Sequence, residues 1–216
     1  MNSVDMNRRD FLKATALAGG GFMLEMSLPA AALDEDLGTL VGSKELNVFV
    51  QIASDGQITI YSAIPEMGQG VKTTLPMIIA EEMGARWDDV VVLDAPVDSK
   101  KFGLQGAGGS TSIPRNFNSM RRMGASARQM LINAASESME VDSQELQASE
   151  SRVVHTSGQS LTFGQLAALA VRQPVPDPET LSFKDPRSYT IIGTSVGGVD
   201  NLVIATGQSL FGIDAD

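Results

Sequence analysis

The sequence contains no cysteine, few aromatic residues, a single histidine and fewer basic than acidic side chains. Without cysteine, the chain itself forms no disulfide, zinc–thiolate site or iron–sulfur cluster, so any electron-transfer cluster must belong to a partner. The formal net charge of −10 argues against a nucleic-acid binder, which needs clustered Lys and Arg. The histidine, His155, is expected at the surface and receives no role. What remains is the composition of a globular domain with an aliphatic and methionine-rich core.

The N-terminus has the pattern of an export signal. Arg8 and Arg9 precede a short apolar run over residues 14–26, which ends near the small residues Ala30–Ala32. This pattern predicts a twin-arginine signal peptide over residues 1–32 and therefore a periplasmic location. The alternative is an ordinary amphipathic N-terminal helix. Residues 33–45 are acidic and contain glycine, and they are predicted to be a linker.

Hydrophobic periodicity predicts an α+β fold, with a mixed sheet of hairpins and packed helices. Residues 47–52 and 57–62 alternate apolar and polar side chains around a turn, which indicates a β-hairpin. Residues 71–83 have helical spacing, and Pro76 fits only if it lies in the first turn. Gly84 is expected to cap the C-terminus of this helix. The continuous apolar run at residues 90–93 predicts a buried strand.

Further along, apolar residues from Phe117 to Ala134 recur at steps of three and four. This spacing predicts a helix with a narrow face at Gly124 and Ala127, where another element can pack closely. Ser112 or Asn116 is expected to cap its start. Four arginines lie on or near this helix: Arg115, Arg121, Arg122 and Arg128. At least two of them are expected on a solvated face, and the first is the one expected near a phosphate.

The following elements are marked by local signals. A hairpin is predicted over residues 146–155, with its turn at Glu150 and Ser151. A short helix follows, over residues 161–170, with Thr162 as its N-terminal cap. Prolines then punctuate an extended segment from residue 174 onward.

Two glycine-rich stretches each stand directly before a predicted helix, at Pro65–Gly70 and at Gly106–Ser112. Such turns expose backbone N–H groups, and the following helix presents its positive end to an anion. Either stretch alone is equally the pattern of a tight turn that binds nothing. Two in one small domain favour a single extended polyanionic ligand. Gln69 adds an amide side chain, which both donates and accepts without changing charge.

Together these stretches resemble the molybdenum-binding subunit of the xanthine dehydrogenase and aldehyde oxidase family, in the branch of the isoquinoline 1-oxidoreductase beta subunit. The resemblance is carried by Glu66–Gly70 with Thr73 or Thr74 behind it, and by Gly109–Ser112 with Arg121–Arg128 behind it. It implies that the first motif lies against the molybdenum centre and the second against the cofactor's phosphates. The cofactor-binding residues implied are Met67, Gly68, Gln69, Gly70, Gly109, Ser110, Thr111 and Ser112.

The resemblance also implies a domain plan and partners. Residues 46–200 would be the N-terminal part of a molybdopterin-binding domain, and residues 201–216 the truncated start of a hammerhead-like domain. No residue matches the family's catalytic glutamate, Glu66 included, and no direct metal ligand is implied, so the chain is expected to be an N-terminal fragment that is inactive alone. The implied cofactor is molybdopterin with molybdenum, in its cytosine dinucleotide form.

The implied reaction is the oxidation of aldehydes or N-heterocycles with water as the oxygen source. Electrons would leave through two-iron clusters on a small iron–sulfur subunit to an acceptor such as a cytochrome, and association with the membrane is also implied. Two other functions remain open from the residues. One is a truncated, non-catalytic cofactor-binding module, and the other is an exported phosphate- or nucleotide-binding domain unrelated to molybdenum.

Overall fold

The computed structural model describes residues 12–16, 22–26, 48–98, 102, 104–208 and 211. Its larger sheet has the strand order β1-β2-β3-β4-β5, in which only β4 and β5 are parallel. The strands are β1 (Leu12–Ala16), β2 (Phe22–Met26), β3 (Val48–Ile52), β4 (Ile58–Ser62) and β5 (Val90–Asp94). A smaller antiparallel sheet contains β6 (Leu146–Ser149), β7 (Arg152–His155) and β8 (Ser160–Thr162).

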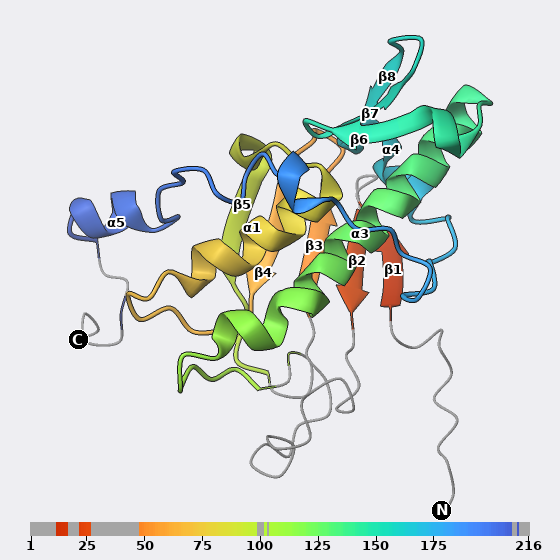
Figure 1. Ribbon diagram of the computed structural model, residues 1–216. Coiled ribbons are helices and arrows are strands. Elements are labelled where there is room, and N and C mark those ends of the chain that lie inside the picture. The colour runs from red at the N-terminus through yellow and green to blue at the C-terminus, as the bar shows by residue number, and fades with distance from the viewer. Residues whose placement is uncertain are drawn as a thin grey trace, which may run out of the picture.

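Helices cover one face of the larger sheet (Figure 1), which confirms the predicted α+β class and the mixed sheet. The helices are α1 (Val71–Met83), α3 (Ser112–Met139), α4 (Phe163–Ala170) and α5 (Asn201–Ala205). Short 3-10 turns occupy Trp87–Asp89, Ser143–Glu145 and Pro186–Ser188. Strand β4, helix α1 and strand β5 form a β-α-β unit, and this unit explains the parallel pairing.

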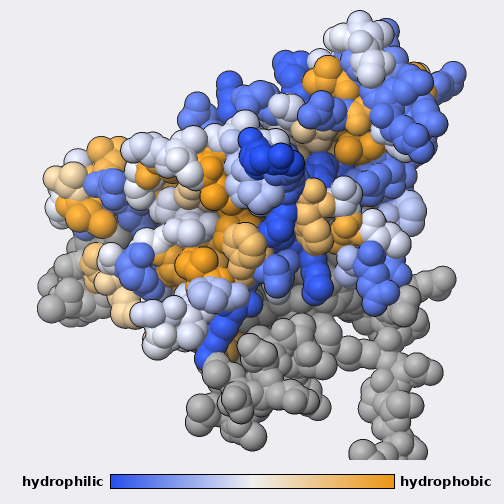
Figure 2. All heavy atoms as spheres, viewed as in Figure 1, coloured by the Kyte–Doolittle hydropathy of each residue, from blue (hydrophilic) through white to orange (hydrophobic). Residues whose placement is uncertain are grey.

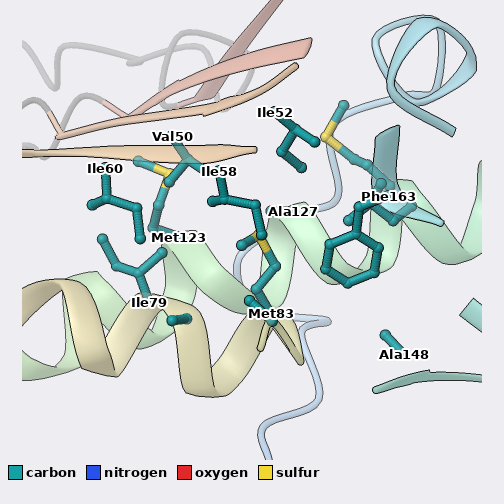
Figure 3. Close-up of a cluster of buried hydrophobic side chains, with 14 of the residues drawn as sticks. Val50, Ile52, Ile58, Ile60, Ile79, Met83, Met123, Ala127, Ala148 and Phe163 are labelled. Carbon is teal, nitrogen blue, oxygen red and sulfur yellow. The ribbon is translucent and has the colours of Figure 1, made fainter. Parts of the chain in front are cut away.

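The core lies between the larger sheet and the pair α1 and α3. Side chains such as Val50 and Ile58 of the sheet face Ile79 of α1 and Met123 of α3 (Figure 3), and all four are fully or almost fully buried. At Gly124 the two helices approach so closely that an added Cβ would lie 2.4 Å from the carbonyl oxygen of Ile79. The predicted narrow face therefore packs directly against α1.

Several local predictions are confirmed. Gly84 ends α1 in the left-handed conformation, at φ 78°. Glu150 and Ser151 form the predicted hairpin turn at φ 51° and 57°. Thr162 caps α4 by accepting a hydrogen bond from the backbone N–H of Gln165, whose side chain bonds back to complete a capping box.

Three predictions of local structure are wrong. Pro76 lies inside α1 and beyond its first turn, because the helix already begins at Val71. Helix α3 begins at Ser112 after Thr111, and no side chain caps it. The apolar run at residues 90–93 is an edge strand rather than a buried one. Its side chains Val91 and Leu93 are 38% and 43% exposed.

The termini bear on the predicted domain boundaries. The predicted linker, residues 33–45, lies outside the described residues, as does most of the predicted signal peptide. Within that predicted signal peptide, the backbone of β2 pairs with β3, and Phe22 is fully buried.

Within the described part of the chain, no helix has the length and apolar character needed to cross a membrane. Apolar residues gather over α5 at the left of Figure 2, where Leu202 and Ile204 are 73% and 52% exposed.

Glu81, which is fully buried on α1, binds the proline-rich segment that follows α4. This segment, from residue 174 onward, is called the C-terminal segment below. Its Oε2 accepts hydrogen bonds from the backbone N–H groups of Thr190, Ile191 and Ile192 at 2.9, 2.7 and 3.1 Å. Its Oε1 lies 3.1 Å from the Nζ of Lys184. Burial raises the pKa of the Glu81 carboxyl, but these hydrogen bonds and the lysine outweigh it, so the pKa lies below its ordinary value.

The neighbouring Glu82 joins the same segment to α3. Its carboxylate lies 2.6 Å from Nε of Arg121 and 3.3 Å from a terminal nitrogen of Arg128. Both arginines also donate to backbone carbonyls of the segment, at Lys184 and Ser182. The two adjacent glutamates therefore connect α1, α3 and the C-terminal segment through buried charge.

Candidate functional site

A cleft of about 260 Å³ opens at the carboxyl ends of the parallel strands β4 and β5. It is lined by Ser62, Ala63, Ile64, Pro65, Glu66, Lys72, Asp94, Ala95, Val97, Gln105, Asp200 and Phe211. Crevices at the carboxyl ends of parallel strands are the usual ligand sites of α/β sheets. The first glycine-rich turn and the loop before the second one therefore border the same cleft.

Lys72 is the buried cation of this cleft. Its Nζ lies 2.7 Å from Oδ2 of Asp94, at the end of β5, and 3.0 Å from Oδ1 of Asp200, just before α5. Burial lowers the pKa of Lys72, but the hydrogen bonds to the two carboxylates outweigh it and raise the pKa above its ordinary value. Lys72 is therefore charged, and it holds the C-terminal segment against the start of α1.

The first glycine-rich turn is closed by its own glutamate. Glu66 Oε1 accepts hydrogen bonds from the backbone N–H groups of Gly68 and Gly70 at 2.7 and 2.9 Å. Its Oε2 accepts one from the backbone N–H of Lys72 at 3.0 Å. The expectation that this turn presents unpaired N–H groups is therefore wrong for these three residues, because a carboxylate of the same chain already accepts their N–H groups.

Gln69 is held by the same turn. Its Oε1 accepts from the backbone N–H of Met67 at 2.7 Å, and its Nε2 donates to the carbonyl of Pro65 at 3.0 Å. An amide nitrogen carries two N–H bonds, and the second has no acceptor among the described residues. Gln69 is thus a fixed side chain with one donor available. Met67 beside it is largely exposed.

The second glycine-rich stretch, unlike the first, has backbone N–H groups without an acceptor among the described residues. Gly109 and Ser110 adopt the left-handed conformation at φ 62° and 58° before α3 begins. Thr111 uses its hydroxyl to donate to the carbonyl of Gly108 at 3.0 Å. In the described part of the chain, the backbone N–H groups of Gly109, Ser110, Ser112 and Ile113 meet no acceptor. This turn therefore offers the unpaired donors that an anion needs.

Among the described residues, two of the four arginines have an acidic partner and two have none. Arg121 and Arg128 are paired with Glu82 and belong to the packing between helices. Arg115 is exposed, one turn into α3, and no partner for it or for Arg122 occurs among the described residues. Arg115 is therefore the arginine nearest the open turn that remains available to a phosphate.

These residues fit a phosphate-bearing cofactor at the second turn better than at the first. The second turn combines unpaired backbone N–H groups, the Ser110 hydroxyl and a nearby unpaired guanidinium, which is the donor set that phosphate takes. At the first turn, Glu66 already accepts three backbone N–H groups, and Gln69 offers its remaining amide N–H. Within the described ranges, no three His, Asp or Glu side chains gather as metal ligands.

Sequence reasoning missed Lys72, Asp94 and Asp200, which the cleft brings together. Lys72 carried a usable signal, because a lysine on the apolar side of a predicted helix needs an acidic partner. Nothing in the sequence identified that partner as Asp200, which is 128 positions away. Glu66 was recognised as part of a motif, but its contact with the turn was not predicted.

Fold and site together define an α+β domain with two features: a turn with unpaired backbone N–H groups among the described residues, and a cleft at the carboxyl ends of two parallel strands. A family model for the molybdopterin cofactor-binding domain matches residues 15–201. The chain belongs to this family, in the molybdopterin-binding subunits of the xanthine dehydrogenase family.

Curated relatives agree with this assignment. The chain is 30% identical over 219 residues to a membrane-bound aldehyde dehydrogenase (pyrroloquinoline-quinone) of Gluconacetobacter polyoxogenes, covering 97% of this chain and 28% of that protein. It is 35% identical over 150 residues to the isoquinoline 1-oxidoreductase beta subunit of Brevundimonas diminuta, covering 66% and 19%. It is 26% identical over 197 residues to a nicotinate dehydrogenase subunit of Pseudomonas putida, covering 89% and 16%. The chain thus spans less than a third of the length of these relatives.

A solved structure supports the fold. A Cu,Mo-CO dehydrogenase in its carbon monoxide reduced state aligns with a TM-score of 0.50 and 22% identity, over 84% of this chain and 23% of that one. Quinoline 2-oxidoreductase from Pseudomonas putida 86 aligns with a TM-score of 0.49 and 21% identity, over 74% and 20%.

Proposed function

We propose that this chain supplies cofactor contacts in a molybdenum hydroxylase that oxidises aldehydes or N-heterocycles, with water as the oxygen source. The observation that carries the proposal is the open turn at residues 109–113, with its unpaired backbone N–H groups, in a member of the molybdopterin-binding family. The relatives named for aldehyde, isoquinoline and nicotinate oxidation support this substrate class. When bound, the cofactor supplies the redox chemistry.

In this proposal, residues of this chain bind the cofactor and orient it. The N–H groups of Gly109 and Ser110, with those of the first turn of α3, donate to the cofactor's phosphates, and Arg115 adds charge. Gln69, fixed by Met67 and Pro65, donates its remaining N–H toward the metal's ligands. We propose the cytosine dinucleotide form of molybdopterin, and two-iron clusters on a small partner subunit that pass electrons to an acceptor such as a cytochrome.

Cofactor content in the purified protein, produced in a host that makes molybdopterin, tests the phosphate contacts. Glycine tolerates the positive φ of Ser110, so Ser110→Gly removes the hydroxymethyl side chain without straining the turn. Losing one hydrogen bond to a charged group costs roughly 1.5–3 kcal/mol, which is about a ten- to hundredfold loss of affinity. We expect less bound molybdenum and nucleotide in Ser110→Gly and no change in the exposed control Ser195→Gly. Full cofactor content in both variants would refute the assignment.

Gln69→Ala tests the first turn in the assembled enzyme. If the Gln69 hydrogen bond strengthens in the transition state, the variant should lower kcat about ten- to hundredfold with molybdenum content unchanged. Wild-type kcat together with full molybdenum content would leave Gln69 as a turn residue only.

We also propose export through the twin-arginine route, supported by Arg8 and Arg9 and by the small residues near Ala32. Cleavage there would remove both β1 and β2 and leave β3 at the edge of the sheet. Replacing both arginines with lysine should leave the precursor in the cytoplasm, as followed by fractionation and immunoblotting. Unchanged export of that variant would contradict the proposal.

A further inference from the structure

The two glycine-rich turns differ in whether their backbone N–H groups already have a hydrogen-bond acceptor. At the first, three backbone N–H groups converge on the Glu66 carboxylate over distances of 2.7–3.0 Å. One of the three, from Lys72, belongs to the first turn of α1. The carboxylate therefore stands where a helix N-terminus would otherwise hold an external anion. At the second turn, the corresponding N–H groups have no acceptor in the described part of the chain.

The glycines of the first turn are needed for its backbone conformation. Gly68 and Gly70 adopt φ 98° and 81°, and a Cβ added to either would meet no atom within 4 Å. The need for glycine therefore comes from the backbone angles, which aim the N–H groups at Glu66. Burial raises the pKa of the Glu66 carboxyl, but the hydrogen bonds from these N–H groups outweigh it and lower the pKa below its ordinary value.

We propose that Glu66 is a built-in anion that closes the first turn, so that the ligand's phosphates bind only at residues 109–113 and the first turn contributes Gln69 alone. This inference rests on the proposed function for the identity of the ligand. Glu66 acts as a positioning residue here. Its carboxylate fixes the turn on which Gln69 is mounted, and it repels a second anion from the start of α1.

Amide hydrogen exchange and chemical shifts of the isotope-labelled chain test this inference, with inorganic pyrophosphate as the probe. In the wild type, the amides of Gly68, Gly70 and Lys72 should be protected, and pyrophosphate should shift only amides of residues 109–113. In Glu66→Ala, the three amides should lose protection at least tenfold, and pyrophosphate should now shift them as well. Glu179→Gln changes an exposed carboxylate in the C-terminal segment and should behave as the wild type.

One further measurement keeps the test decisive. If Glu66→Ala fails to fold, acidification of the wild type replaces it, because protonation of Glu66 should remove protection from the same three amides together. Unchanged protection in Glu66→Ala, or pyrophosphate shifts at Gly68 and Gly70 in the wild type, would overturn the inference. If pyrophosphate shifts neither turn in the wild type, the proposed phosphate site fails, while the protection of the three amides still decides the role of Glu66.

Discussion

Replacement of the buried Glu81 should detach the C-terminal segment from α1. In Glu81→Gln, one neutral oxygen can still accept from the N–H groups of residues 190–192. Each bond then changes from charge-assisted, worth roughly 1.5–3 kcal/mol, to neutral, worth roughly 0.5–1.5 kcal/mol. Three such changes of about 1 kcal/mol give a loss near 3 kcal/mol. The new amide also faces the ammonium of Lys184, which it cannot pair.

Glu81→Ala should cost more, because it removes the acceptor of three N–H groups, of which that of Ile191 is buried and those of Thr190 and Ile192 are partly buried, at up to about 1–3 kcal/mol each. The upper part of that range approaches the whole stability of a typical domain, about 5–15 kcal/mol. We therefore expect the alanine variant to lose the ordered segment. Hydrogen exchange at residues 190–192 would report this locally, and urea unfolding would report it globally.

The pH dependence gives an independent test with a defined sign. The folded pKa of Glu81 lies below its unfolded value, so its contribution to stability is fully present above the unfolded pKa. That contribution is lost as the pH falls through the unfolded and then the folded pKa. The stability difference between wild type and Glu81→Gln should therefore shrink on acidification. A urea midpoint of Glu81→Gln equal to that of the wild type at neutral pH, with exposed Glu179→Gln as control, would refute the reasoning.

Three further substitutions test the packing and the capping. Gly124→Ala should lower stability by about 1–3 kcal/mol, because its Cβ would clash with the carbonyl of Ile79; Gly108→Ala, which meets no atom within 4 Å, is the matched control in thermal unfolding. Ser126→Ala should raise stability by about 1 kcal/mol in urea unfolding, since the buried Ser126 hydroxyl has no partner among the described residues; a loss would show that the hydroxyl is satisfied. Thr162→Ala should cost about 1 kcal/mol through loss of the α4 cap, and an unchanged midpoint would contradict that role.

Local chemistry explains what was predictable from the sequence. The hairpin turn at Glu150, the left-handed Gly84 and the cap at Thr162 each depend on residues within a few positions, so their backbone preferences are visible in the sequence. The helix spacing around Gly124 likewise predicted a close approach, although not the partner helix. The family motifs at the two glycine-rich turns identified the cofactor class, which the match to the molybdopterin cofactor-binding family confirms.

Contacts between distant residues were decided only by the tertiary structure. The strand order placed the apolar run at residues 90–93 on an edge, because no later described strand pairs with it. The return of the C-terminal segment across α1 brought Asp200 to Lys72 and gave Glu81 its three donors. Even the state of the first turn depended on where the Glu66 carboxylate points. The sequence by itself determined which groups could bind an anion, whereas the fold decided which of them were already satisfied, because satisfaction depends on neighbours that only chain folding supplies.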